Sequence, residues 1–253
     1  MEIVKKGRFL KTKHVWFEDD NKKENRSDVI VLHACAYSNY PGGIAERQYS
    51  LISDIAKESI WDDFNKTVKN EVLRSGREGI EVFFYTSDDI KKNPEIIREF
   101  EEVFHGMYEE KEIKGKWLDK RLIDAYVEAD ALLLTVACMD GKKQVWHTYI
   151  YGNGNARLLY SCSCFREIDK ELQKAIGRAN KYLHWQDIKF LKQNNVEKYD
   201  WGGGLSGIDS PNGIDKFKMS FGGEIVEYYN ITVLHSTKAR IFYGLKNVMK
   251  RIK

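Results

Sequence analysis

The sequence predicts an α/β chain of the α+β kind, with a mixed, largely antiparallel sheet flanked by helices. Three strand patterns follow one another with glycine turns between them, which indicates an antiparallel meander. A long helical pattern comes next, and a strand, a short helix and a last strand complete the order. These elements are predicted at 131–139, 144–151, 156–164, 170–194, around Tyr199, at 215–220 and at 224–234.

The part of the chain before the meander predicts a strand-helix-strand unit and a pair of helices. The first helix is indicated by apolar residues at three- and four-residue spacing. Tyr40-Pro-Gly-Gly43 reads as a turn between the first two strands. The predicted ranges are strands 29–33 and 48–52, helix 54–76, strand 80–85 and helices 94–107 and 117–127.

The domain organisation follows from this order. Residues 1–77 are expected to add strands and a helix to the edge of the sheet, as a reduced first half. Residues 78–236 form the main domain, and 237–253 form a basic amphipathic helix. That tail is expected to lie on an anionic membrane, to grip a tRNA backbone, or to dock on its own domain or a symmetry mate.

Composition excludes several classes of protein. With 253 residues and 42% hydrophobic content the chain is globular, and its net charge of +3 is too small for a dedicated nucleic-acid binder. The four cysteines show no CxxC pairing, the first residues show no apolar signal segment, and no long uncharged apolar run is present. We therefore expect a cytoplasmic protein without disulfides, peripheral to the inner membrane face at most.

Two glycine-rich segments lie close together near the end of the main domain: Tyr199-Asp-Trp-Gly-Gly-Gly204 and Gly213-Ile-Asp-Lys-Phe-Lys-Met-Ser-Phe-Gly-Gly223. Glycine permits close approach of the backbone to a ligand. The segments therefore predict a ligand site faced by Lys218. The alternative is an exposed lysine whose stem covers Phe217 and Phe221.

The element order and these motifs resemble the GNAT acyltransferase fold, and in particular its FemABX branch, whose members aminoacylate peptidoglycan precursors. The similarity covers about two thirds of the chain and is carried by residues 68–82, 185–203 and 213–223. The resemblance implies that Phe217 and Lys218 lie at the acyl-transfer site. Asp215 replaces an aromatic residue of the family pattern, and the acceptor-binding half is reduced.

The resemblance also suggests a phosphate site after the meander, where GNAT enzymes bind a pyrophosphate at a helix start. The residues that match this pattern are Lys174, Gly177, Arg178, Ala179 and Asn180. The alternative is that Gly177 only interrupts a helix, whose core face is then formed by Leu172, Ile176, Leu183 and Ile188.

An attacking amine must lose a proton, and His147 and Tyr160 on the second and third meander strands are the candidates for its removal. His147 between aromatic neighbours also fits a hydrogen-bonded sheet residue, and His184 is expected to pack in the core. Asp200 is expected either to orient the acceptor or to cap the glycine turn. The remaining substrate-side candidates are Trp201, Gly202, Gly203 and Phe221.

No metal site is expected, because Cys162 and Cys164 lack a second ligand pair. The sequence thus predicts an acyltransferase without a tightly bound cofactor, which moves an acyl or aminoacyl group from aminoacyl-tRNA or acyl-CoA to a primary amine. The acceptor would be a cell-envelope, amino-sugar or peptide-like precursor. The alternative is a catalytically silent GNAT-like module that binds a partner enzyme or a membrane. The sequence does not decide between a monomer and a dimer.

Overall fold

The computed structural model describes residues 1–17, 27–110, 118–164, 170–205 and 210–251. The chain folds into two compact units. The first comprises Met1–Tyr49, Arg121–Ala125 and Val226–Lys253, and the second comprises Ser50–Lys120 and Tyr126–Ile225. The boundary that the sequence suggested between residues 77 and 78 falls inside the second unit.

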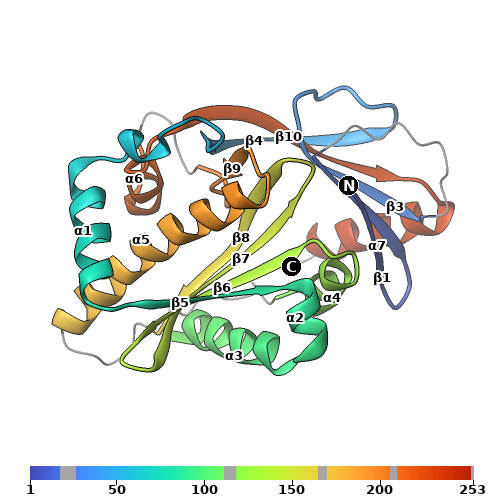
Figure 1. Cartoon of the computed structure of the whole chain (residues 1–253). Coiled ribbons are helices and arrows are strands. Elements are labelled where there is room, and N and C mark those ends of the chain that lie inside the picture. Colours follow the sequence, from blue (N-terminus) through green and yellow to red (C-terminus); the bar gives the residue numbers. More distant parts are fainter. Residues whose placement is uncertain (18–26, 111–117, 165–169, 206–209, 252–253) are drawn as a thin grey trace. The chain divides into compact units, whose positions relative to one another are not determined.

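The second unit has a sheet in the order β4-β9-β8-β7-β6-β5, flanked by helices (Figure 1). All neighbouring strands are antiparallel except β8 and β9. This confirms the predicted mixed, largely antiparallel sheet and its meander. The elements are β4 Gly43–Asp54, of which the last residues belong here, η1 Ile60–Asp63, α1 Lys66–Arg77, β5 Glu81–Thr86, α2 Ser87–Lys92, α3 Glu95–Glu110, β6 Leu132–Met139, β7 Lys142–Gly152, β8 Asn155–Ser163, α5 Lys170–Gln193, β9 Lys198–Asp200 and α6 Gly213–Met219. Helix α4, Lys120–Glu128, is divided between the units, and its residues Arg121–Ala125 belong to the first.

Helices cover both faces of this sheet, with α5 on one face and α3 on the other (Figure 1). Side chains alternate between the faces along each strand. On β7, His147 and Tyr149 therefore face α5, whereas the Trp146 ring lies 6.5 Å from Phe100 of α3. The α5 side holds a core of α1, α5 and strand residues around Tyr199 and Trp201.

Two helices differ from the prediction. Helix α1 begins at Lys66 instead of residue 54, because the Asn65 side chain caps it by accepting a hydrogen bond from the Val68 amide at 2.8 Å. Ile60 and Phe64 are buried as expected, but from a 3-10 turn and a loop. Helix α2 was missed, although Thr86 and Asp89 form the capping box that could have revealed it.

The single parallel pair of this unit shapes its site. β8 pairs with β9 only over Asn155–Arg157 and Lys198–Asp200. Beyond these residues, the β7–β8 register shifts so that Leu159 is the extra residue of a bulge. β9 ends at Asp200, whereas β8 continues to Ser163 without a strand partner on this edge among the described residues.

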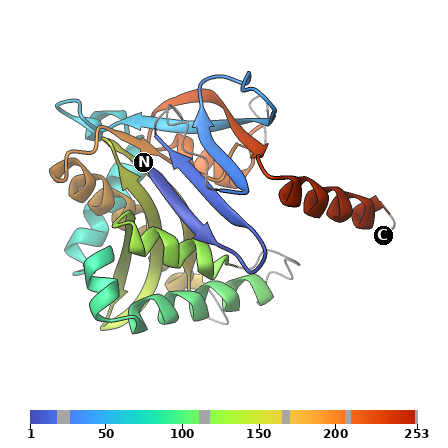
Figure 2. The same cartoon turned by 90° about the vertical axis from the view of Figure 1, so that its right-hand side faces the viewer.

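The first unit contains the strand order β1-β2-β3-β10, with β2 and β3 parallel. Its elements are β1 Glu2–Lys6, β2 Lys11–Trp16, β3 Val29–Cys35, most of β10 Glu224–Leu234 and α7 Thr237–Arg251. The β1–β2 hairpin was not predicted, because lysines occupy many of its positions. Figure 2 shows α7, in dark red, as a single helix following β10. No helix in the described ranges is long and apolar enough to cross a bilayer.

Candidate functional site

Two adjoining cavities lie where β8 and β9 separate. Their volumes are about 370 and 340 Å³, and both are lined by Leu158, Ser161, Trp201, Ile214 and Lys218. A further cavity of about 600 Å³ shares Met107 and Ser163 with the second. The three cavities thus follow β8 from its bulge to its end.

Lys218 stands where the first two cavities join. It comes from α6, which Asn212 caps through the amides of Ile214 and Asp215. Only 7% of Lys218 is exposed, and its ammonium donates to the carbonyl oxygens of Gly202 at 2.6 Å and Gly204 at 3.3 Å. The reading of Lys218 as an exposed surface lysine is therefore wrong. Burial lowers the pKa of Lys218, while the charges of Asp215 and Asp200 oppose that shift.

The glycine turn that holds this ammonium needs its glycines. Gly202, Gly203 and Gly204 have φ values of +60°, +66° and +65°, in the left-handed region. A Cβ at Gly202 would lie 1.9 Å from the carbonyl oxygen of Leu158. The turn therefore lies directly against β8, and its carbonyls point at Lys218.

Asp200 stabilises the glycine turn at Gly202–Gly204 through hydrogen bonds. Its carboxylate accepts hydrogen bonds from the Gly202 amide at 2.8 Å and the Ser50 hydroxyl at 2.5 Å, and it forms a buried ion pair with Arg157. Asp200 lines neither of the two joined cavities. The structure thus favours the capping role among the two that the sequence left open, and it adds Arg157, which the sequence did not suggest.

The aromatic candidates separate into lining and core residues. Trp201 lines both joined cavities while its Nε1 donates to the Ser53 hydroxyl at 3.0 Å. Phe217 is half-buried and lines the second cavity. Phe221 is fully buried and packs against Trp201, so it lies in the core instead of at the predicted substrate surface. Gly203 lines the first cavity.

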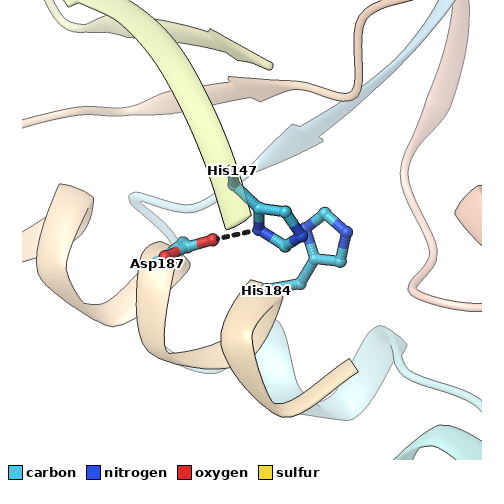
Figure 3. Close-up of side chains that lie close together, drawn as sticks. All are labelled: His147, His184 and Asp187. Carbon is cyan, nitrogen blue, oxygen red and sulfur yellow. Dashed lines mark hydrogen bonds and ion pairs between the residues drawn. The ribbon is translucent and has the colours of Figure 1, made fainter. Parts of the chain in front are cut away.

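A chain of buried hydrogen bonds runs from the second cavity into the α5 side of the sheet. His184 lines the cavity, and its Nδ1 lies 2.8 Å from the Tyr199 hydroxyl. That hydroxyl lies 2.8 Å from the hydroxyl of Tyr149, which donates to Asp187 Oδ2 at 2.6 Å. Asp187 Oδ2 also lies 2.7 Å from Nδ1 of His147, as the dashed line in Figure 3 shows.

The direction of these hydrogen bonds fixes the state of His184. A carboxylate only accepts, so Tyr149 donates to Asp187, Tyr199 donates to Tyr149, and Nδ1–H of His184 donates to Tyr199. Nε2 of His184 then carries the lone pair, and no hydrogen bond from a described residue occupies it. Burial, with the neighbouring His147 and Lys218, holds the pKa of His184 well below its usual value, so the ring is neutral at pH 7.

His147, the predicted base, lies behind this chain. It is fully buried, lines neither joined cavity, and its Nε2 lies 2.7 Å from Oδ1 of Asn180. It is therefore the hydrogen-bonded sheet residue of the alternative reading. Tyr160, the other candidate, lines the first cavity from the opposite face and packs on Phe104. Burial raises the pKa of Tyr160, which makes it a hydrogen-bond donor instead of a base.

The predicted phosphate loop at 174–180 is helical. α5 begins at Lys170, so Gly177 and Ala179 lie inside it, and the core-face alternative with Ile176, Leu183 and Ile188 is confirmed. Arg178 is paired with Glu78, and Lys174 with Glu171. Asn180 alone reaches the second cavity. The residues immediately before α5, 165–169, lie outside the described part of the chain.

Sequence reasoning missed His184, Asp187, Tyr149 and Tyr199 as a group. The available signal was the spacing of Asn180, His184 and Asp187, which puts three polar residues on one face of α5, among core residues. Ligand atoms of His147, His184 and Asp187 lie within 4.8 Å of one another, a spacing that a metal ion could use. The Nδ1 atoms of His147 and His184 and Oδ2 of Asp187 already make hydrogen bonds to protein groups. That no metal binds here stays our prediction.

No protein-family model matches this chain, and no curated protein matches it. Solved structures do. FemX is similar with a TM-score of 0.63 and 12% identity, over 96% of this chain and 85% of FemX. The C-terminal domain of a protein described as a lysylphosphatidylglycerol synthetase from Agrobacterium fabrum has a TM-score of 0.58 and 13% identity, over 86% of this chain and 72% of that domain.

A third similar structure is L-PGS from Bacillus licheniformis, with a TM-score of 0.52 and 12% identity, over 83% of this chain and 69% of that protein. At these identities the likeness shows the fold. The chain therefore has a FemABX-like, GNAT-type fold, as the motifs at Tyr199–Gly203 and Gly213–Gly223 predicted.

Proposed function

We propose that this protein is an acyltransferase that moves an acyl or aminoacyl group from an activated ester to a primary amine by direct attack in a ternary complex. The observation that carries the proposal is the buried ammonium of Lys218 at the junction of two cavities, fixed by the carbonyls of a glycine turn. A positioned cation in a largely water-excluded site stabilises developing negative charge strongly. The cavities on either side supply space for donor and acceptor.

Lys218 stabilises the oxyanion that forms when the amine attacks the ester carbonyl. Two of its N–H groups are directed at Gly202 and Gly204, which leaves the third for the oxyanion or for a donor phosphate. Asp215 and Asp200 favour the charged form that this role requires. Phe217 and Trp201 line the cavity wall beside it and shape the channel.

His184 takes the proton that the attacking amine loses. The proton moves from the amine nitrogen to Nε2, while Nδ1–H passes its proton to Tyr199, Tyr199 to Tyr149, and Tyr149 to Asp187 Oδ2. The carboxylate thus becomes neutral and the imidazole stays neutral, which suits a ring whose pKa is held low by burial. When the tetrahedral intermediate collapses, the ester C–O bond breaks, and the proton returns along the same chain through Nε2 to the leaving oxygen. Burial also raises the pKa values of Tyr199 and Tyr149, so both hydroxyls hold their protons between turnovers.

An aminoacyl ester is the donor that we favour over acyl-CoA. The segment that suggested a pyrophosphate site is helix, and its two cationic side chains, Lys174 and Arg178, are paired with acidic residues. The neighbours with the same fold include FemX, L-PGS and the C-terminal domain of a protein described as a lysylphosphatidylglycerol synthetase. The acceptor class is an amine of a cell-envelope, amino-sugar or peptide-like precursor, as the family resemblance implies.

The test is thermal stabilisation of the purified protein by aminoacylated tRNA, by acetyl-CoA and by desulfo-CoA, because a ligand raises the melting temperature with the logarithm of its concentration. We expect a shift with charged tRNA only. Lys218→Ala should then lower turnover about 10²–10³-fold. Lys216→Ala, an exposed lysine of the same helix, is the matched control and should leave turnover unchanged.

Other outcomes distinguish the alternatives. A rise in melting temperature with CoA species that is lost in Arg178→Ala would favour acyl-CoA as the donor. No shift with any of these ligands in a folded protein would favour the silent binding module. Tyr199→Phe keeps the ring but interrupts the proton chain, so turnover that is unchanged in this variant would remove the relay while leaving the role of Lys218 intact.

A further inference from the structure

A surface of mixed apolar and basic character lies in the first unit and contains none of the candidate site residues. It combines the tip of the β1–β2 hairpin with the first turns of α7, and we call it the hairpin–α7 surface. A groove of about 570 Å³ runs across it, and of its lining residues only one, Lys238, is polar. The lining residues are Phe9, Leu10, Lys238, Ile241 and Phe242.

The apolar side chains of this surface point to solvent. Phe9 is 57% exposed, Ile241 59% and Phe242 42%, and the Phe9 and Phe242 rings lie 6.4 Å apart. α7 contacts its own unit with another face, because Ala239 is fully buried. Ile241 and Phe242 therefore stay largely exposed instead of docking on their own domain, which was one of the readings that the sequence allowed.

Basic residues belong to the same hairpin and helix as the groove, and the Asp28 carboxylate also lies near Lys238. Arg8 lies 5.3 Å from the centre of the Phe9 ring, and Lys6, Lys238 and Arg240 are exposed. The first unit as a whole has 16 basic and nine acidic residues, a net +7, whereas the second unit has 25 basic and 29 acidic residues, a net −4. The small net charge of the chain thus hides a strongly basic unit.

We propose that the hairpin–α7 surface docks on an anionic lipid bilayer, with Phe9, Ile241 and Phe242 in the headgroup region and the basic residues on the lipid charges. Exposed aromatic and aliphatic residues flanked by lysine and arginine are the features that bind such an interface. A nucleic acid would neutralise the charge but offers no apolar medium for Ile241. A second copy of this surface would bring like charges together.

The experiment is co-sedimentation of the full chain with vesicles of phosphatidylcholine alone or mixed with phosphatidylglycerol. We expect binding to the anionic vesicles, weakened by salt. Phe9→Ser, Ile241→Ser and Phe242→Ser combined should weaken binding at least about tenfold. Ile44→Ser and Leu73→Ser, at equally exposed apolar positions outside the surface, should leave it unchanged.

Three results would overturn the proposal. The first is equal binding of wild type and triple variant to anionic vesicles. The second is tRNA binding that Arg8→Glu and Lys238→Glu abolish while no vesicle binding occurs. The third is self-association, measured by analytical ultracentrifugation, that the triple variant abolishes without any vesicle binding. None of these readouts requires turnover, so the proposal fails or stands apart from the proposed acyltransfer.

Discussion

At the scale of single residues, the site depends on where a few polar groups are buried. Lys218 loses solvation on burial and regains partners in two backbone carbonyls, which only a turn of left-handed glycines can direct at it. His184 is neutral because burial, with His147 and Lys218 beside it, holds its pKa well below the usual value. The same burial that costs stability thus supplies a cation and a neutral base within one cavity.

Gly202→Ala tests the close approach of the turn to β8. A Cβ at this position would overlap the Leu158 carbonyl and occupy a left-handed conformation, so we expect a loss of about 3 kcal/mol or more in the free energy of unfolding. Gly203→Ala is the matched control, since its nearest contact would be at 3.3 Å and it should cost only the ~1–2 kcal/mol of the left-handed backbone. Urea denaturation measures both, and equal losses would contradict the argument.

His184 predicts a pH dependence of stability. The unfolded chain takes up a proton on this residue near its ordinary pKa of about 6.5. The folded state does not, because burial holds the pKa of His184 lower. Stability is therefore full above pH 6.5 and falls as the pH is lowered, by up to ~1.4 kcal/mol per pH unit from this group.

The measurement is urea denaturation of wild type and His184→Gln between about pH 7.5 and 5.5. This window brackets the ordinary histidine pKa of about 6.5 and lies above the ordinary pKa values of carboxyl groups. The difference between the two slopes isolates His184. His235→Gln, which replaces an exposed histidine, is the control for the loss of an imidazole. A variant slope equal to that of wild type would show that His184 accepts a proton equally in both states.

At the scale of elements, two helices act as platforms. α5 presents Asn180, His184 and Asp187 on one face, and α6 presents Lys218 to the cavity junction. α6 has only seven residues, so its position depends on its cap instead of its length. Asp215, which replaces an aromatic residue of the family pattern, completes the capping box with Asn212 and favours the charge on Lys218.

Removing two caps should therefore have different consequences. Asn212→Ala and Asn65→Ala each remove a side chain that caps a helix, at the start of α6 and of α1, and each should cost about 1 kcal/mol of unfolding free energy. Only Asn212→Ala should also lower turnover, because α6 carries Lys218. Asn212→Asp keeps a capping oxygen and should retain most of the wild-type turnover. Equal turnover of the two alanine variants would separate α6 from catalysis.

At the scale of the whole molecule, the charge is divided between the two units. The first unit carries a net +7 and the second a net −4, which the net charge of +3 conceals. A polyanionic partner is thus more favourable than the composition indicated, although the candidate catalytic residues all belong to the acidic unit. Charge and chemistry are placed on different parts of one chain.

The salt dependence of donor binding follows at this scale. If the donor is charged tRNA, log K should fall with log salt with a slope of roughly −0.7 to −0.9 for each phosphate contacted, so that several contacts make the decline steep. An acyl-CoA donor should give a shallow slope. Fluorescence anisotropy of labelled donors across a salt series measures it, with Lys238→Glu as a probe of the basic unit. A shallow slope for tRNA would contradict extensive backbone contact.

Much of the fold was predictable because its signals are local. The meander at residues 131–164, the long helix after it and the glycine motifs follow from alternation, period and turn residues, and the structure confirms them. The start of α1 was not predictable from apolar spacing, since Ile60 and Phe64 pack in the core without being part of the helix. The β1–β2 hairpin was missed because lysines occupy many of its positions and interrupt the apolar alternation.

The sequence by itself determined the glycine-rich motif and the lysine that follows it, and from these we predicted a ligand site, because glycine lets the backbone approach a ligand closely. Only the tertiary structure decided which groups meet that lysine. His147 was the predicted base, yet strand alternation turns it toward Asn180 and Asp187, while α5 brings His184 to the cavity from 37 residues further along the chain. Solvation and proton transfer depend on distances across the sheet, and these arise only when helix and strands pack.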